Sequence, residues 1–187
     1  MAVTVVSGLP RSGTSLMMQM LAAGGMPVLT DGVRAADEDN PHGYFEYEPV
    51  KATKRDASWL ERAEGKAVKV VYALLRDLPA SHEYRVIMMH RDLNETIASQ
   101  REMLRRSGRA GADVSDDKLR DLFAREMADI ADWLLRQANF KSLDVEYREC
   151  VKEPSVVPAR VNAFLGGEWN EVAMIAAVDP DLYRRGA

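Results

Sequence analysis

The chain has 187 residues, of which 47% are hydrophobic and 29% are charged, so we expect a single domain over residues 1–187 with a full hydrophobic core. A formal net charge of −4 argues against a general nucleic-acid-binding protein, which would need a basic surface. The single cysteine, Cys150, excludes an intrachain disulfide, and the lack of a Cys/His cluster argues against a structural zinc site.

The first predicted element is a buried strand followed by a helix. Residues 3–6 form a β-branched run that is typical of a strand inside a parallel sheet. Residues 16–21 place apolar side chains on one helical face, and the Gly and Pro residues at 24–27 end that helix. Because the chain enters its core at once and Gln19 interrupts the apolar run, neither a signal peptide nor a membrane span is predicted. We therefore expect a cytoplasmic protein.

The segment between strand and helix has the pattern of a phosphate-binding loop. Gly8 and Gly13 have the loop spacing, and Thr14 and Ser15 follow with hydroxyl groups. In such a loop the backbone N–H groups and the positive end of the helix dipole converge on one point, where an anion is expected. The lysine that usually follows the second glycine is replaced by Thr14, and the nearest cation in the loop is Arg11.

This loop resembles the 5′-phosphosulfate loop of the sulfotransferases that use 3′-phosphoadenosine 5′-phosphosulfate (PAPS). The family pattern is Pro-Lys/Arg-Ser-Gly-Thr-Thr/Ser, and it is matched here by Pro10, Arg11, Ser12, Gly13, Thr14 and Ser15. The resemblance implies that these residues bind the donor and that Arg11 stabilises the transferring sulfuryl group.

A short strand at 27–30 and a polar loop at 31–43 come next. The following sequence, Asn40-Pro41-His42-Gly43-Tyr44-Phe45-Glu46, is similar to an Asn-Pro-x-Gly-Phe/Tyr-Phe-Glu segment of bacterial sulfotransferases. That resemblance implies an acceptor-site role for Glu46. On chemistry alone, this carboxylate is either a general base toward a hydroxyl or an ordinary surface glutamate beside core aromatic residues. His42 is a weaker candidate base.

A helix is predicted over 48–64 and a third strand over 67–75. Lys69 is hard to place in a buried strand unless it faces an anion. Cytosolic sulfotransferases have a similar strand that ends in Lys-Thr-His, with the histidine as base. Lys69 matches their lysine, but Val71 stands at the histidine position. Either Glu46 replaces that base, or the family mechanism does not carry over.

Residues 85–90 form the fourth predicted strand, and a helix capped by Asp92 or Asn94 follows. Arg91 at the end of the strand and Ser99, two turns into the helix, can converge on one group. In sulfotransferases a similar strand-Arg-Asp/Asn-x7-Ser unit holds the 3′-phosphate of the nucleotide. The resemblance implies that role for Arg91 and Ser99.

The remaining elements are a loop at 108–114 that is the candidate lid, an amphipathic helix over 115–139, a strand over 142–147 and a helix over 153–165. The side chains expected on the buried stripe of the long helix are Leu119, Leu122, Phe123, Ile130, Trp133 and Leu134. The C-terminal Arg184 and Arg185 resemble part of the Arg-Lys-Gly segment that completes the 3′-phosphate site in larger family members. The Gly-Asp-Trp-Lys that should follow is absent.

These elements predict a three-layer α/β/α P-loop-like fold with a mostly parallel five-stranded sheet and a ligand outside the carboxyl ends of the strands. The resemblance implies a sulfotransferase that uses PAPS and no metal. Its acceptor would be a hydroxyl or amine on a small molecule, a glycan or a carrier-bound group. So short a chain either leaves its acceptor cleft open or closes it with a second subunit in a homo-oligomer.

Two other classes stay open. A P-loop kinase is disfavoured by the missing lysine and by Asp92, which is a poor magnesium ligand directly after an arginine. A non-catalytic module that binds adenosine 3′,5′-bisphosphate is kept open by the missing histidine.

Overall fold

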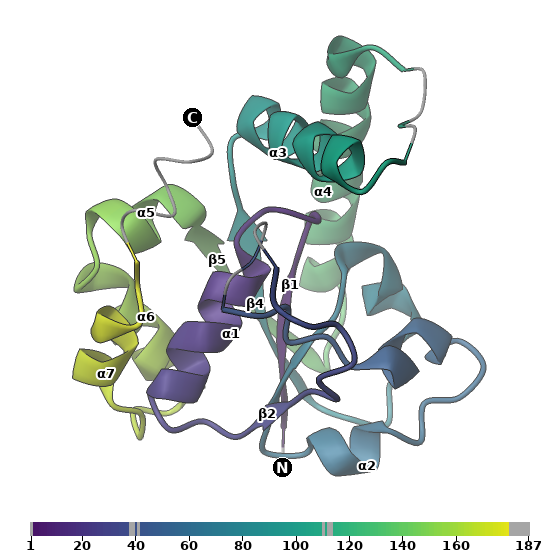
Figure 1. Cartoon of the computed structure of the whole chain (residues 1–187). Coiled ribbons are helices and arrows are strands. Elements are labelled where there is room, and N and C mark those ends of the chain that lie inside the picture. Colours follow the sequence, from purple (N-terminus) through teal and green to yellow (C-terminus); the bar gives the residue numbers. More distant parts are fainter. Residues whose placement is uncertain (1, 38–39, 41, 110, 112–113, 180–187) are drawn as a thin grey trace.

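The computed structural model describes residues 2–37, 40, 42–109, 111 and 114–179. Its centre is a five-stranded sheet with the order β2-β3-β1-β4-β5, in which every neighbouring pair is parallel (Figure 1). The strands are β1 (Val3–Gly8), β2 (Val28–Leu29), β3 (Ala67–Lys69), β4 (Tyr84–His90) and β5 (Phe140–Glu146). The predicted mostly parallel five-stranded sheet is confirmed.

The central strand β1 is buried along its whole length and is hydrogen-bonded to β3 on one side and β4 on the other. In this register Val6 lies opposite Lys69, and Gly8 lies opposite Met89. Because the strands are parallel, their carboxyl ends share one edge of the sheet. The loop after β1, Lys69 and the residues after β4 are therefore brought to the same place.

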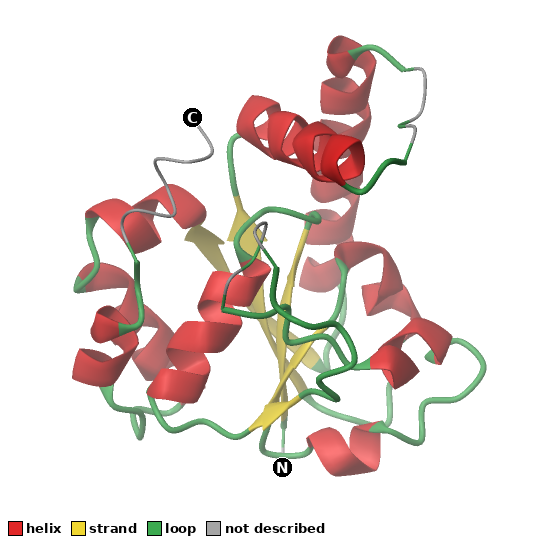
Figure 2. Ribbon diagram, in the orientation of Figure 1, coloured by secondary structure: helices red, strands yellow, loops and turns green. Residues whose placement is uncertain are grey.

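Helices cover both faces of the sheet, as Figure 2 shows. One face packs on α1 (Thr14–Ala23), α5 (Tyr147–Lys152), α6 (Val156–Leu165) and α7 (Glu171–Ala176), and its core includes Val6 and Ile87. The other face packs on α2 (Leu60–Ala63) and on the C-terminal half of α4 (Asp116–Leu135), and its core includes Val5 and Val86. The alternation of Val5 and Val6 between the two cores is the period of two expected for a strand.

The helix predicted over 48–64 is wrong. The chain forms a 3-10 helix, η1 (Glu48–Ala52), and the short α2, with a turn between them. Within that turn the Asp56 carboxylate accepts a hydrogen bond from the Ser58 N–H at 2.9 Å. Such a hydrogen bond from a side chain satisfies a backbone N–H without a helix. The helix that the apolar periodicity predicts is therefore interrupted at this turn.

The third strand is shorter than predicted. After Lys69 the chain leaves the sheet and enters a second 3-10 helix, η2 (Tyr72–Asp77). The last sheet-like bond is donated by the Val70 N–H to the Val6 carbonyl at 3.0 Å. Beyond this point β1 itself turns into the loop at Gly8, so no long partner remains for residues 71–75 on that side.

The predicted buried stripe of the long helix is only partly correct. Ile130 and Leu134 are buried and Trp133 packs against the same core, but Leu122 is 41% exposed. Figure 1 shows the reason: the first half of α4 stands beyond the sheet edge next to α3 (Leu93–Arg106).

The C-terminal elements also differ from the prediction. Strand β5 begins at Phe140 instead of residue 142, and the helix predicted from 153 starts at Val156 after the separate α5. Helix α7 was not predicted. Among the described helices, none combines the length and apolar character that a membrane span requires.

Candidate active site

The loop between β1 and α1 is so tight that its two glycines cannot be replaced. A Cβ on Gly8, which has φ of 147°, would lie 2.5 Å from Ser12 Oγ and 2.6 Å from the Met89 carbonyl oxygen. A Cβ on Gly13, which has φ of 99°, would lie 2.5 Å from Cδ2 of Tyr147. All three distances are shorter than a real Cβ contact, and both φ values favour glycine. The turn leads directly into the first residue of α1, Thr14, so that the helix N-terminus faces the loop.

Two hydroxyl groups at this loop have no hydrogen-bond partner among the residues that the structure describes. Ser7 Oγ and Ser12 Oγ are both fully buried, yet neither donates or accepts a bond. A buried polar group without a partner costs about 1–3 kcal/mol. Neither residue is among those that line the cleft at this edge of the sheet.

Arg11 ties the loop to α3. Its backbone is in the left-handed region with φ of 74°, a strained conformation for a residue with a side chain. Its Nε donates to Ser99 Oγ at 3.0 Å, and Gln100 Nε2 donates to the Pro10 carbonyl at 2.8 Å. The sequence-predicted residues Arg11 and Ser99 are thus in direct contact.

Arg91 lies beside them, directly after β4. Its side chain is only 9% exposed, and its Nε donates to Glu95 Oε2 at 2.9 Å. Its guanidinium lies 4.8 Å from the ring centre of Tyr147, and its Nη1 is 3.5 Å from the Arg11 carbonyl oxygen. Arg11, Ser99 and Arg91 therefore form one cationic cluster next to the loop.

The helix that carries Ser99 has a well-defined start. The Asp92 carboxylate accepts hydrogen bonds from the N–H groups of Asn94 and Glu95, so Asp92 is the N-cap of α3. Of the two candidate caps, the structure selects Asp92.

Lys69 is buried at the end of β3 and points toward the same loop. Its Nζ donates to Ser15 Oγ and to the Tyr44 carbonyl, both at 3.0 Å. Burial lowers the pKa of Lys69 from 10.5 to about 8. The amine is consequently mostly charged at neutral pH and loses its proton as the pH rises through about 8.

A cleft of about 1010 Å³ opens at this edge of the sheet. The sequence-predicted residues that line it are Pro10, Arg11, Gly13, Thr14, Ser15, His42, Glu46, Lys69, Arg91 and Ser99. Ser12 is buried behind the lining. Arg184 and Arg185 lie outside the described residues.

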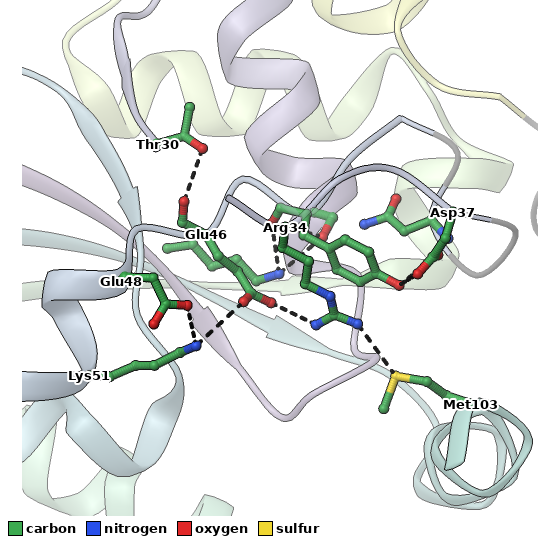
Figure 3. Close-up of polar contacts among 11 residues, drawn as sticks. Thr30, Arg34, Asp37, Glu46, Glu48, Lys51 and Met103 are labelled. Carbon is green, nitrogen blue, oxygen red and sulfur yellow. Dashed lines mark hydrogen bonds and ion pairs between the residues drawn. The ribbon is translucent and has the colours of Figure 1, made fainter. Parts of the chain in front are cut away.

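Glu46 lines the cleft and sits in a network of polar contacts (Figure 3). Its carboxylate is 2.9 Å from Arg34 Nη1 and 4.0 Å from Lys51 Nζ. Its carbonyl accepts from Thr30 Oγ1 at 3.0 Å, and the preceding residue, Phe45, has a left-handed φ of 53°. The strained backbone and these contacts fix the direction of the carboxylate.

Tyr44 supports this network. Its hydroxyl donates to the Asp37 carboxylate at 2.7 and 2.8 Å, and burial raises its pKa to about 12. The guanidinium of Arg34 lies 3.3 Å from the centre of its ring. His42 is further out, 42% exposed, with its Nε2 3.9 Å from Asp179 Oδ2.

Sequence reasoning missed several residues of the site. Arg34 stands in a polar loop where no motif marks it, and Glu95 and Tyr147 are recognisable only once Arg91 has been placed in space. The spacing of four residues between Arg91 and Glu95 was a signal for that pair. Within the described ranges, no group of three or more His, Cys, Asp or Glu residues is arranged to hold a metal ion.

No family model and no curated protein matches this sequence. Solved structures do match. The sulfotransferase domain from the Synechococcus PCC 7002 olefin synthase is 16% identical with a TM-score of 0.58, covering 100% of this chain and 87% of that one. The sulfotransferase domain from the curacin biosynthetic pathway is 13% identical with a TM-score of 0.55, covering 98% and 86%. Retinol dehydratase in a complex with retinol and PAP is 16% identical with a TM-score of 0.52, covering 97% and 69%. At these identities the likeness establishes the fold, which is that of the sulfotransferases.

Proposed function

We propose that this protein is a PAPS-dependent sulfotransferase that transfers a sulfuryl group to a hydroxyl or amine. The observation that carries the proposal is the contact of Arg11 Nε with Ser99 Oγ at 3.0 Å, with Arg91 beside it. Together these three residues form a second anion-binding position next to the phosphate-binding loop. A donor with a 5′-phosphosulfate and a 3′-phosphate needs both positions, whereas an ordinary loop ligand needs only the first. The fold shared with a PAP-bound retinol dehydratase supports this reading.

In the proposed reaction the loop N–H groups, Thr14 and Ser15 hold the phosphosulfate, while Arg11 and Lys69 offset charge on the sulfuryl oxygens. The bond from sulfur to the nucleotide oxygen breaks as the acceptor oxygen or nitrogen bonds to sulfur, leaving adenosine 3′,5′-bisphosphate. Glu46 takes the acceptor proton, and His42 is the weaker candidate for that role. Arg184 and Arg185 are proposed to complete the 3′-phosphate site.

Calorimetric titration with adenosine 3′,5′-bisphosphate, adenosine 5′-monophosphate and magnesium-ATP tests the donor site. Wild-type protein should bind the bisphosphate in preference to the monophosphate without magnesium. Loss of a charge-assisted bond in Arg91→Ala should reduce that preference by about ten- to a hundredfold. The matched control is Arg105→Ala, because Arg105 is 72% exposed on α3, the helix that follows Arg91, and pairs with Glu102. Equal binding of the two nucleotides, or a requirement for magnesium, would favour the kinase.

Glu46→Gln tests the base. Removing a positioned general base should lower turnover roughly 10²- to 10⁴-fold while nucleotide affinity stays unchanged. Turnover is measured with radiolabelled donor, and nucleotide affinity by the same titration. Unchanged turnover in the variant would exclude Glu46 as the base.

A wild-type protein that binds the bisphosphate but transfers nothing to any hydroxyl or amine would favour the non-catalytic module.

A further inference from the structure

Arg34 lies in the cleft between Glu46 and α3. Its Nη1 is hydrogen-bonded to Glu46 Oε1 at 2.9 Å, and its Nη2 lies 4.0 Å from the sulfur of Met103 on α3 (Figure 3). The side chain is 40% exposed and lines the cleft. The cation thus stands between the proposed base and α3.

The guanidinium is held in place but its hydrogen-bonding capacity is underused. Its plane is fixed by the Tyr44 ring at 3.3 Å, and Tyr44 is itself fixed by Asp37. A guanidinium has five N–H donors, and a thioether is a weak acceptor. Among the described contacts, only Glu46 accepts a strong bond from Arg34. A rigid, half-exposed guanidinium facing a sulfur atom is well suited to bind a carboxylate or phosphate through Nη2.

The other cations nearby do not share this position. Arg106 also lines the cleft, but its Nε donates to Glu102 at 2.7 Å. Lys51 contacts Glu46 from the other side, is 61% exposed, pairs with Glu48 and is not part of the cleft lining. Arg34 is therefore the cation best placed to meet an anionic group close to Glu46.

We propose that Arg34 binds an anionic group, a carboxylate or a phosphate, on the acceptor. The protein's acceptors would then be small hydroxy or amino acids, or the corresponding phosphate compounds. Because one guanidinium contacts both Glu46 and the anion, the reacting hydroxyl or amine lies only a few bonds from the anionic group. This inference rests on the proposed function, since it assigns the acceptor half of the same cleft.

The test uses matched probes with adenosine 3′,5′-bisphosphate already bound. The probes are mandelate, α-hydroxybenzylphosphonate and the neutral methyl mandelate, in which the hydroxyl carbon is bonded directly to the anionic or ester group, and their affinities are measured by NMR titration. We expect at least one anionic probe to bind about ten- to a hundredfold more tightly than the ester. The better of the two anions identifies carboxylate or phosphate as the natural group.

Variants separate recognition of the anion from support of Glu46. Arg34→Gln should bring the affinity for the anionic probe down to that for the ester, and Arg34→Lys should retain part of the preference. Lys51→Gln is the matched control, because it removes the other cation on Glu46 and should keep the full preference. Bisphosphate affinity, which should stay unchanged in all three, verifies that the variants are folded.

The proposal is overturned if wild-type protein binds the ester as tightly as both anions, if it binds no probe, or if Arg34→Gln keeps the preference. In any of these cases, a retained preference for the bisphosphate over adenosine 5′-monophosphate would still support the proposed donor site, and only the acceptor proposal would fail. Loss of that nucleotide preference would instead remove the proposed function itself.

Discussion

At the scale of single residues, Lys69 is a cleft residue whose pKa depends strongly on its surroundings. Its folded-state pKa of about 8 lies below the ordinary value of 10.5, because burial disfavours the ammonium form. The folded protein therefore binds fewer protons than the unfolded chain between these two values. Burial of Lys69 costs stability at lower pH, and that cost is relieved as pH rises through this range.

An anionic nucleotide beside Lys69 should reverse this shift and draw a proton onto the amine. At about pH 8.5 wild-type protein should therefore take up protons when adenosine 3′,5′-bisphosphate binds, whereas Lys69→Met should not. Calorimetry in two buffers with different ionisation enthalpies measures the uptake. At this pH the ligand phosphates, whose second pKa is about 6, are already ionised, so the difference between wild type and Lys69→Met reports the amine alone. Identical binding heats in both buffers at this pH would show that Lys69 does not face the nucleotide.

At the scale of elements, the sequence was most informative where local and tertiary requirements agree. The strand, loop and helix around Gly8 and Gly13 were predictable for two reasons. Each glycine stands where a Cβ would clash with its neighbours, and the β-branched run before them suits a central strand. Arg91 and Ser99 were predictable from their spacing across the strand-to-helix turn.

The elements that failed were those decided by distant neighbours or by local side-chain bonds. Residues 71–75 are apolar enough for a strand, but the pairing of β1 with β3 ends at Val6 and Lys69, and β1 itself ends at Gly8. Residues 53–58 were included in a predicted helix that the Asp56 turn interrupts. The network of Arg34, Tyr44 and Asp37 joins residues in an irregular loop, where no periodicity predicts which side chains meet.

At the scale of the whole molecule, the cleft is assembled from widely separated parts of the chain. The loop before α1, Lys69 on β3, Arg91 after β4 and Ser99 on α3 all contribute to it. These groups come together only in the folded sheet. A ligand that contacts all of them can bind the native state but not the unfolded chain, so its binding should stabilise the entire fold.

Adenosine 3′,5′-bisphosphate at a hundred times its Kd should accordingly add about 2.7 kcal/mol to the free energy of unfolding. For a chain of this size each kcal/mol raises Tm by roughly 2–4 °C, so the expected increase is roughly 5–11 °C by scanning calorimetry. At the same concentration Arg91→Ala should show a much smaller increase, because its affinity is lower, while Arg105→Ala should match wild type. Equal shifts in Arg91→Ala and wild type would mean that the 3′-phosphate does not contact the cluster of Arg11, Ser99 and Arg91. The second anion position would then lie elsewhere along the cleft.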